Sequence, residues 1–582
     1  MKKLRNIIPM LLFPIIILYL FEWYTHNPFT TMKIRIQLLN IVLFELIMAL
    51  LLFLFGKLKT ALRCQTILFM IIGLANYYVL EFRSAPIMPW DILSIGTAAS
   101  VANNFKYTLS KETVFVLIGF VILILLESKA TLELKKDWRI RVGGVLASFA
   151  LLWGFTAMLH QDSTVARFKL YDKLFTPTVM SKRDGTAVAF LMELKYIVVE
   201  KPDGYNKEDA AALLASYDTN DTESAAHTPN IIVIMNEAFS DLSVLGDFET
   251  NEDYMPFLHS LMQEGTPNTI SGHLNVSVLG GNTANTEFEF LTGNTMAFLP
   301  QGSVAYQQYV KNNDYSIATY LKSKGYDTIA MHPYNASGWD RDKVYPLLGF
   351  DTFYSLKDWV NPVKIRKYVS DQSCYDKIIE LYEQKDANTP FFLFNVTMQN
   401  HSSYSEEYDN FHPDITVEGT NSKILPNYLS LIKLSDQALC NLIEYFSQAD
   451  EDTIIVFFGD HQPSNSVAAP VWKINGRSGD SLTEEEEALR YKVPFIIWAN
   501  YDIEAASSVE TSANYLGSHV LRAAGLPLYD YRNYLSQLEE QYPVLTAIRV
   551  ENAQGISTPV KDVKSTLQDY MTLQYYNIFT QK

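Results

Sequence analysis

Five apolar stretches within the first 160 residues restrict the fold of this 582-residue chain more than any other feature. They are residues 7–23, 38–56, 67–80, 114–126 and 142–159. A helix needs about 20 apolar residues to cross the hydrocarbon of a bilayer, and each stretch approaches that length, although the third and fourth are short. We therefore expect residues 1–160 to form an α-helical membrane domain with five transmembrane helices, and not the buried helices of a soluble protein.

Charge divides the chain in two. Residues 1–159 carry 16 Lys and Arg against 8 Asp and Glu, whereas the remainder carries 31 against 56. The net charge of −17 argues against nucleic-acid binding. Basic side chains gather at the N-terminus (Lys2, Lys3, Arg5), in a predicted short loop after the second stretch (Lys57, Lys59, Arg63) and in another after the fourth (Lys129, Lys135, Lys136, Arg139, Arg141). The positive-inside rule assigns these groups to the cytoplasm, so an odd number of spans puts the rest of the chain outside the cell.

The pattern changes beyond the membrane domain. Residues 161–227 are expected to form interfacial helices and a linker. From residue 228 onward, short apolar runs at 231–235, 328–331, 391–396, 454–458 and 493–498 alternate with helix-like segments. Strands that are apolar on both faces indicate a mostly parallel sheet covered by helices on both sides. Residues 228–582 are thus predicted to be an extracellular α/β domain with a C-terminal subdomain.

Polar side chains follow four of these predicted strands. Glu237 follows the first run, His332 the second, His401 the third, and Asp460 with His461 the fourth. In parallel α/β sheets, ligands bind at the carboxyl ends of the strands. Each residue alone is more often a structural hydrogen-bonding group than a ligand. Together, their oxygen and imidazole groups suit a divalent ion such as Mn²⁺, Zn²⁺ or Mg²⁺.

A candidate nucleophile lies in the stretch that begins with Gly280 and Gly281. There a glycine turn precedes Thr283 at a predicted helix N-terminus, where backbone N–H groups favour an anion. Coordination to a divalent cation lowers the pKa of a threonine hydroxyl and makes it a better nucleophile. The alternative is that Thr283 simply caps the helix.

These residues, in this order and at this spacing, resemble the lipoteichoic acid synthase family, whose members are sulfatase-like proteins of the alkaline phosphatase superfamily. The resemblance extends over the membrane spans, the junction and an extracellular sulfatase-like domain. The motifs that carry it are Glu237, Gly281 to Phe288 (GNTANTEF), His332 with Trp339 and Arg341, His401, and Gly459-Asp460-His461.

The resemblance implies two sets of site residues. The metal ligands are Glu237, Thr283, Asp460 and His461, with Mn²⁺ as the metal, Mg²⁺ or Zn²⁺ as alternatives, and Thr283 also as nucleophile. The residues that bind the phosphoglycerol headgroup are His332, Trp339, Arg341 and His401. Two departures border that pocket, because Pro-Tyr-Asn-Ala follows His332 and Ser-Ser follows His401 in place of the usual second His and Pro. These departures affect the expected identity of the donor or acceptor more than the expected chemistry of the transfer.

The implied function is a membrane-anchored, metal-dependent phosphoglycerol transferase of a Gram-positive-type bacterium. It would take glycerophosphate from phosphatidylglycerol through a phospho-threonine intermediate and add it to a glycolipid-anchored polyglycerolphosphate chain of lipoteichoic acid. Three alternatives stay open: a phosphoethanolamine transferase, a lipoteichoic acid primase or phosphodiesterase, and a non-enzymatic cell-wall binding protein. Cleavage of sulfate esters is disfavoured, since no Cys/Ser-x-Pro-x-Arg sequence surrounds Thr283.

Overall fold

The elements of the chain divide between two units in the computed structural model. One unit comprises residues 1–199 with 300–302, and the other residues 200–299 with 303–582. The described residues are 4–83, 86–94, 109–134, 137–171, 177–196, 199, 201–218, 227–300, 303–311, 315–479 and 482–580.

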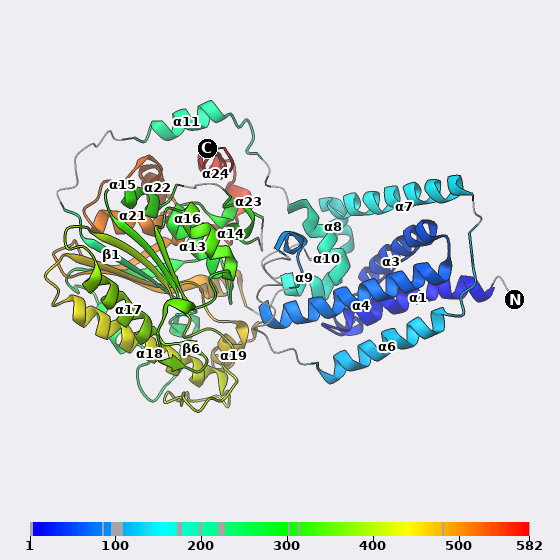
Figure 1. Cartoon of the computed structure of the whole chain (residues 1–582), viewed down its shortest axis with the longest axis horizontal. Helices are drawn as coiled ribbons and strands as arrows, with labels where there is room; N and C mark the ends of the chain where they lie inside the picture. Colours follow the sequence, from blue (N-terminus) through cyan, green and yellow to red (C-terminus); the bar gives the residue numbers. More distant parts are fainter. Residues whose placement is uncertain are drawn as a thin grey trace. The chain divides into compact units, whose positions relative to one another are not determined.

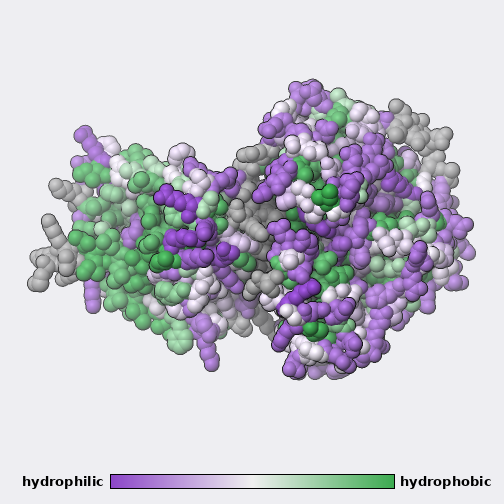
Figure 2. Space-filling view, turned by 180° about the vertical axis from the view of Figure 1, so that it is seen from behind, coloured by the Kyte–Doolittle hydropathy of each residue, from purple (hydrophilic) through white to green (hydrophobic). Residues whose placement is uncertain are grey.

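Apolar helices make up most of the first unit (Figure 1). The longer ones are α1 (Leu4–Glu22), α3 (Ile34–Phe55), α4 (Leu58–Arg83), α6 (Lys111–Glu127) and α7 (Trp138–Leu159). Three segments within them, Ile34–Phe55, Leu58–Glu81 and Trp138–Leu159, are long and apolar enough to cross a membrane, and Ile7–Trp23 is a shorter apolar helix. Hydrophobic side chains dominate the visible surface of this unit, whereas that of the second unit is mainly hydrophilic (Figure 2).

The helices pack through aromatic side chains. Phe44 of α3 lies against Phe69 of α4, with 4.3 Å between ring centroids, and Phe21 of α1 lies 5.1 Å from Phe69. One sequence expectation is wrong in detail, because α4 begins at Leu58 and so includes Lys59 and Arg63, which were expected in a loop. The apolar run marks only the hydrophobic part of a helix whose polar first turns extend beyond it. Lys135 and Lys136 of the second basic group lie outside the described residues.

Short helices follow the apolar ones. The first unit includes α8 (Asp162–Phe168), α9 (Pro177–Asp184) and α10 (Thr186–Glu193). The end of α1 is joined to the start of α10, since the Glu22 carboxylate accepts hydrogen bonds from the backbone N–H of Thr186 (2.8 Å) and its hydroxyl (2.9 Å). The next helix, α11 (Lys207–Ala215), belongs to the second unit. Residues 219–226 of the predicted linker lie outside the described part of the chain.

An eight-stranded sheet forms the centre of the second unit, in the order β10-β2-β9-β8-β1-β7-β3-β4. The strands are β1 (Asn230–Asn236), β2 (Thr269–Asn275), β3 (Asp327–His332), β4 (Thr352–Ser355), β7 (Phe391–Val396), β8 (Thr453–Gly459), β9 (Lys492–Ala499) and β10 (Ala506–Ser512). Only β9 pairs antiparallel with its neighbours in this sheet. The predicted mostly parallel sheet is therefore confirmed, and all five predicted strands are present.

Helices cover both faces of this sheet (Figure 1). On one face, α12 (Pro256–Leu261), α17 (Asp371–Gln384), α18 (Ile424–Phe446) and α19 (Asn465–Ile474) enclose one hydrophobic core. On the other lie α13 (Thr283–Thr292), α15 (Ile317–Ser323), α16 (Arg341–Leu347) and α21 (Ala513–Ala523). Phe290 of α13, for example, stacks 5.8 Å from Phe394 of β7. Because both faces are buried, the central strands are apolar at nearly every position.

A second hydrophobic core lies in the C-terminal part of this unit. It joins α11, α22 (Asp530–Gln541) and α24 (Gln568–Phe579) through residues that include Leu214, Leu535 and Leu573. Beside it is a small antiparallel sheet of β11 (Val544–Leu545), β12 (Val550–Glu551) and β13 (Ser557–Thr558). The helix at the start of the second unit is thus bound to the helices at its end.

Candidate active site

Glu237, Asp460 and His461 form a buried cluster at the carboxyl ends of two adjacent strands. The parallel register of β1 and β8 pairs Asn236 with Gly459. The residues that follow them, Glu237 and Asp460, therefore lie side by side. One ligand atom from each member of the cluster lies within 4.8 Å of the others. The sequence predicted this meeting of strand ends, and the structure brings the three side chains together.

The polar atoms of this cluster suit a divalent cation. Asp460 Oδ1 accepts hydrogen bonds from the backbone N–H groups of Ala238 (2.7 Å) and His461 (2.8 Å). His461 Nδ1 donates to the carbonyl of Gln462 (2.9 Å), which leaves Nε2 with a free lone pair, the tautomer that metal-binding histidines adopt. Asp460 Oδ2 and His461 Nε2 are buried, lie 3.2 Å apart and have no hydrogen-bond partner among the described residues.

The pKa shifts of the two carboxylates also indicate a cation-binding cluster. Burial raises the pKa of Glu237 well above its usual range, and the neighbouring Asp460 raises it further. Burial also raises the pKa of Asp460. Two buried carboxylates this close repel each other when both are charged, and a bound cation relieves that repulsion. The oxygen and imidazole donors fit Mn²⁺, Zn²⁺ or Mg²⁺.

Thr283 is the first residue of α13, which begins beside the cluster. The turn before it has left-handed backbone at Gly280 (φ 67°) and Asn282 (φ 63°), and the Gly280 N–H donates to the carbonyl of Gln462 (3.0 Å). One turn later, the Thr286 hydroxyl donates to the carbonyl of Asp460 (2.8 Å). The Thr283 hydroxyl is close enough to Asp460 to lower the pKa of that carboxyl by hydrogen bonding. The structure therefore places Thr283 beside Asp460, one of the three other predicted ligands.

Three of the predicted headgroup residues interact electrostatically with the cluster or with one another: Arg341 with Glu237, His401 with His461, and His332 with Arg341 and His401. His332 ends β3 and donates from Nδ1 to the carbonyl of Val396 (2.9 Å). Burial lowers its pKa well below the usual range, and the positive charge of Arg341 lowers it further. Arg341 also lowers the pKa of Glu237, so this guanidinium lies within electrostatic reach of the cluster. Trp339, in a short turn before α16, has left-handed backbone (φ 56°) and a half-buried side chain.

Arg341 is already paired with a carboxylate that the sequence analysis gave no role. Its Nε donates to the two oxygens of Glu287, at 3.0 and 3.3 Å, and its Nη2 donates to the same carboxylate. The hydroxyl of Tyr345 donates to Glu287 as well (2.7 Å). Glu287 lies four residues after Thr283, on the same face of α13. The helix that carries the candidate nucleophile thus holds the candidate phosphate-binding arginine.

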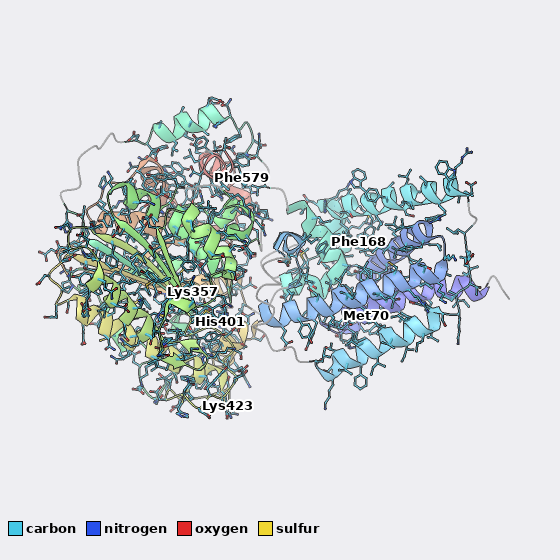
Figure 3. The ribbon with its side chains drawn as sticks, viewed as in Figure 1. Met70, Phe168, Lys357, His401, Lys423 and Phe579 are labelled. Atoms are coloured by element: carbon cyan, nitrogen blue, oxygen red, sulfur yellow. The ribbon has the colours of Figure 1, made fainter. Side chains whose placement is uncertain are left out.

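His401 lies on the loop after β7 and is labelled in Figure 3. Its Nδ1 lies 3.1 Å from the hydroxyl of Tyr368, and its backbone carbonyl accepts a hydrogen bond from Arg366 (2.7 Å). Burial, together with the nearby charges of Lys367 and Arg366, lowers the pKa of His401 to about 4. Sequence reasoning missed Arg366 and Tyr368, because a short hairpin carries them and no motif marks them.

Comparisons with known proteins agree with the motifs. A family model for sulfatases matches residues 229–526. A Rhizobium meliloti protein, assigned by name to modification of cyclic β-1,2-glucan, is 28% identical over 456 residues, which cover 76% of this chain and 69% of that protein. Lipoteichoic acid synthase 1 of Bacillus subtilis is 26% identical over 280 residues, which cover 47% of this chain and 42% of the relative. The resemblance to lipoteichoic acid synthases is thereby confirmed, although the chain spans less than half the length of this relative.

A solved structure supports the fold. The phosphoglycerol transferase GacH of Streptococcus pyogenes, determined in complex with sn-glycerol-1-phosphate, superposes with a TM-score of 0.52 at 23% identity. The match covers 65% of this chain and 94% of that one. At this identity, the likeness shows a shared fold and no more.

Proposed function

Since the chain belongs to the sulfatase family, we propose that it is a membrane-anchored, metal-dependent phosphoglycerol transferase that uses phosphatidylglycerol as donor. The observation that carries the proposal is the convergence of Glu237, Asp460 and His461 beside Thr283 at the start of α13. A nucleophile, a set of metal ligands and nearby cationic or imidazole groups are the parts that phosphoryl transfer requires.

Each residue has a proposed role in the transfer. Glu237, Thr283, Asp460 and His461 would hold the divalent cation, which would supply positive charge at the phosphate and lower the pKa of the threonine hydroxyl. The Thr283 hydroxyl loses its proton to solvent, and Oγ attacks phosphorus as the bond to the diacylglycerol oxygen breaks. The glycerol hydroxyl of the acceptor then displaces Thr283 from the glycerophosphate, and its proton passes to the imidazole that protonated the diacylglycerol oxygen.

The groups around the nucleophile orient the substrate in this proposal. Arg341 faces the phosphate, with its planar guanidinium held by Glu287, and Trp339 borders the glycerol carbons. His332 or His401 donates a proton to the leaving oxygen. Both imidazoles are neutral at pH 7 because their pKa values are lowered, so the proton donor must gain its proton when the negative phosphate binds.

The proposed acceptor is the end of a polyglycerolphosphate chain, as the names of the lipoteichoic acid synthases suggest. A cell-envelope glycan is the second candidate. It is favoured by the Rhizobium meliloti relative, whose name refers to glucan modification and whose match covers 76% of this chain. Phosphoethanolamine transfer is less favoured, since such transferases usually carry several disulfides, whereas Cys374 and Cys440 are free thiols.

The proposal includes the membrane topology. All five apolar helices span the bilayer, the domains divide at residues 160 and 227, and the catalytic domain lies outside the cell. Support comes from the three long apolar helices and from the basic groups between the spans. Accessibility of single introduced cysteines to a membrane-impermeant thiol reagent tests each loop.

Turnover of labelled phosphatidylglycerol by the purified full-length protein tests the activity. We expect diacylglycerol release with Mn²⁺, a loss of at least 100-fold in Thr283→Ala, and nearly unchanged turnover in Thr292→Ala. Thr292 is the matched control, because it lies at the far end of α13, where its hydroxyl donates to the carbonyl of Phe288 (2.6 Å) and accepts from the backbone N–H of Asn294 (3.1 Å). Retained turnover in Thr283→Ala removes Thr283 as the nucleophile. Identification of the phosphorylated product then distinguishes transfer to a polyglycerolphosphate chain from transfer to a glycan.

A further inference from the structure

A short hairpin of the catalytic unit combines exposed apolar and basic side chains. We name residues 356–369, which contain β5 (Lys364–Ile365) and β6 (Tyr368–Val369), the basic hairpin. Two side chains at its tip, Val360 and Val363, are 89% and 66% exposed. Three exposed lysines flank this tip: Lys357, which is labelled in Figure 3, Lys364 and Lys367.

The exposed valines belong to an ordered tip. The indole of Trp359 donates to the carbonyl of Ser373 (3.4 Å), and the backbone N–H of Val363 donates to the hydroxyl of the same serine (3.0 Å). On the other side, the amide of Asn410 donates to the carbonyls of Lys364 (2.9 Å) and Arg366 (3.0 Å). These contacts hold the tip in a position where its two valines cannot pack against the body of the unit.

The three lysines are available for an anionic partner. None of them forms an ion pair within the part of the chain that the structure describes. The acidic group inside the hairpin, Asp358, accepts hydrogen bonds from Ser355 as part of a capping box. On the neighbouring loop, Glu406 accepts from the Tyr408 hydroxyl (2.6 Å) and Glu407 pairs with Lys423 (3.3 Å). The basic tip therefore differs from the acidic sequence around it.

The basic hairpin also reaches the candidate active site. Its Arg366 donates to the backbone carbonyls of Gln399 and His401, both at 2.7 Å. Its Tyr368 places a hydroxyl 3.1 Å from His401 Nδ1. A partner that holds the tip is consequently held next to the site.

We propose that the basic hairpin docks onto an anionic lipid surface. Lys357, Lys364 and Lys367 contact lipid phosphates, while Val360 and Val363 enter the boundary between headgroups and acyl chains. In this arrangement the lysines pair with anionic groups and the valines are removed from water. A soluble polyanion would engage the lysines and leave the valines in water, so a lipid surface is the better fit. The apolar helices of the same chain keep such a surface within reach. The proposal does not depend on phosphoglycerol transfer.

The test uses the full-length protein in liposomes, in a background whose three native cysteines are replaced by alanine. An environment-sensitive fluorophore is attached at Val360→Cys, and brominated acyl chains serve as quenchers. The matched control is Ile556→Cys, an aliphatic residue that is 60% exposed on a turn, residues 552–556, without charged side chains. We expect strong quenching at position 360 and little at position 556 in vesicles that contain anionic lipid.

Charge removal then separates the contributions. Each lysine near an anionic surface raises the equilibrium constant for membrane contact about fivefold. The triple variant Lys357→Gln, Lys364→Gln and Lys367→Gln should therefore have a contact constant about 100-fold lower and should lose the quenching at position 360. High salt should weaken the contact in the same direction. Equal quenching at positions 360 and 556 would overturn the proposal. A spectral change at position 360 caused by soluble polyglycerolphosphate, without quenching by lipid, would overturn it as well and assign the surface to a polymer.

Discussion

Replacement of Glu287 by glutamine tests the buried pair that links α13 to Arg341. Both side chains are almost fully buried, at 0% and 2% exposure. Glu287→Gln keeps the shape but leaves the guanidinium without its counter-charge, which costs about 3–5 kcal/mol for a buried pair. At roughly 2 °C per kcal/mol for a domain of this size, the catalytic unit should melt about 6–10 °C lower.

The assay is thermal unfolding of the detergent-purified full-length protein, followed by tryptophan fluorescence. The matched control is Glu407→Gln, which removes one partner of a pair whose side chains are 83% and 87% exposed. An exposed pair contributes at most about 1 kcal/mol, so the control should melt near the wild type. The double variant Glu287→Gln with Arg341→Gln should be less destabilised than the two single changes added together, because no unpaired charge is left. A melting temperature of Glu287→Gln equal to that of the control would refute the reasoning.

Two further predictions concern the metal and pH. Mn²⁺ at 100 times its dissociation constant should stabilise the chelator-treated protein by about 2.7 kcal/mol, and Asp460→Asn should abolish the rise in melting temperature; an unchanged rise would remove Asp460 from the ligand set. Asp241 and Asp253 raise the pKa of His259 to about 9 from its ordinary value of 6.5. Because the folded state holds this proton more tightly than the unfolded state, the stabilisation is complete below pH 6.5 and is lost as the pH rises toward 9. Urea unfolding at several pH values should show this decline in the wild type and a flatter profile in His259→Gln.

Local patterns predicted much of the fold. The apolar runs that became β1, β3, β7, β8 and β9 were recognised because strands buried on both faces are apolar throughout. The sheet was not predicted in full. The segments of β2 and β10, TISGHLN and ASSVETS, are polar and partly exposed, and β4 has only four residues. Such strands form because a neighbouring strand offers hydrogen bonds, which no local pattern reveals.

The sequence alone determined the division into an apolar, basic front and an acidic α/β rear, and it determined which side chains emerge at the strand ends. Both follow from short-range rules of hydrophobic periodicity and chain direction. Only the tertiary structure decided the partners of those side chains. Glu287 and Arg341 are 54 positions apart and meet because α13 and α16 pack on the same face of the sheet. Likewise, Arg366 supports the His401 loop from a hairpin 35 positions earlier. Pairings over such distances depend on how whole elements pack, since a buried charge without a partner is strongly destabilising and the partner here comes from a different element.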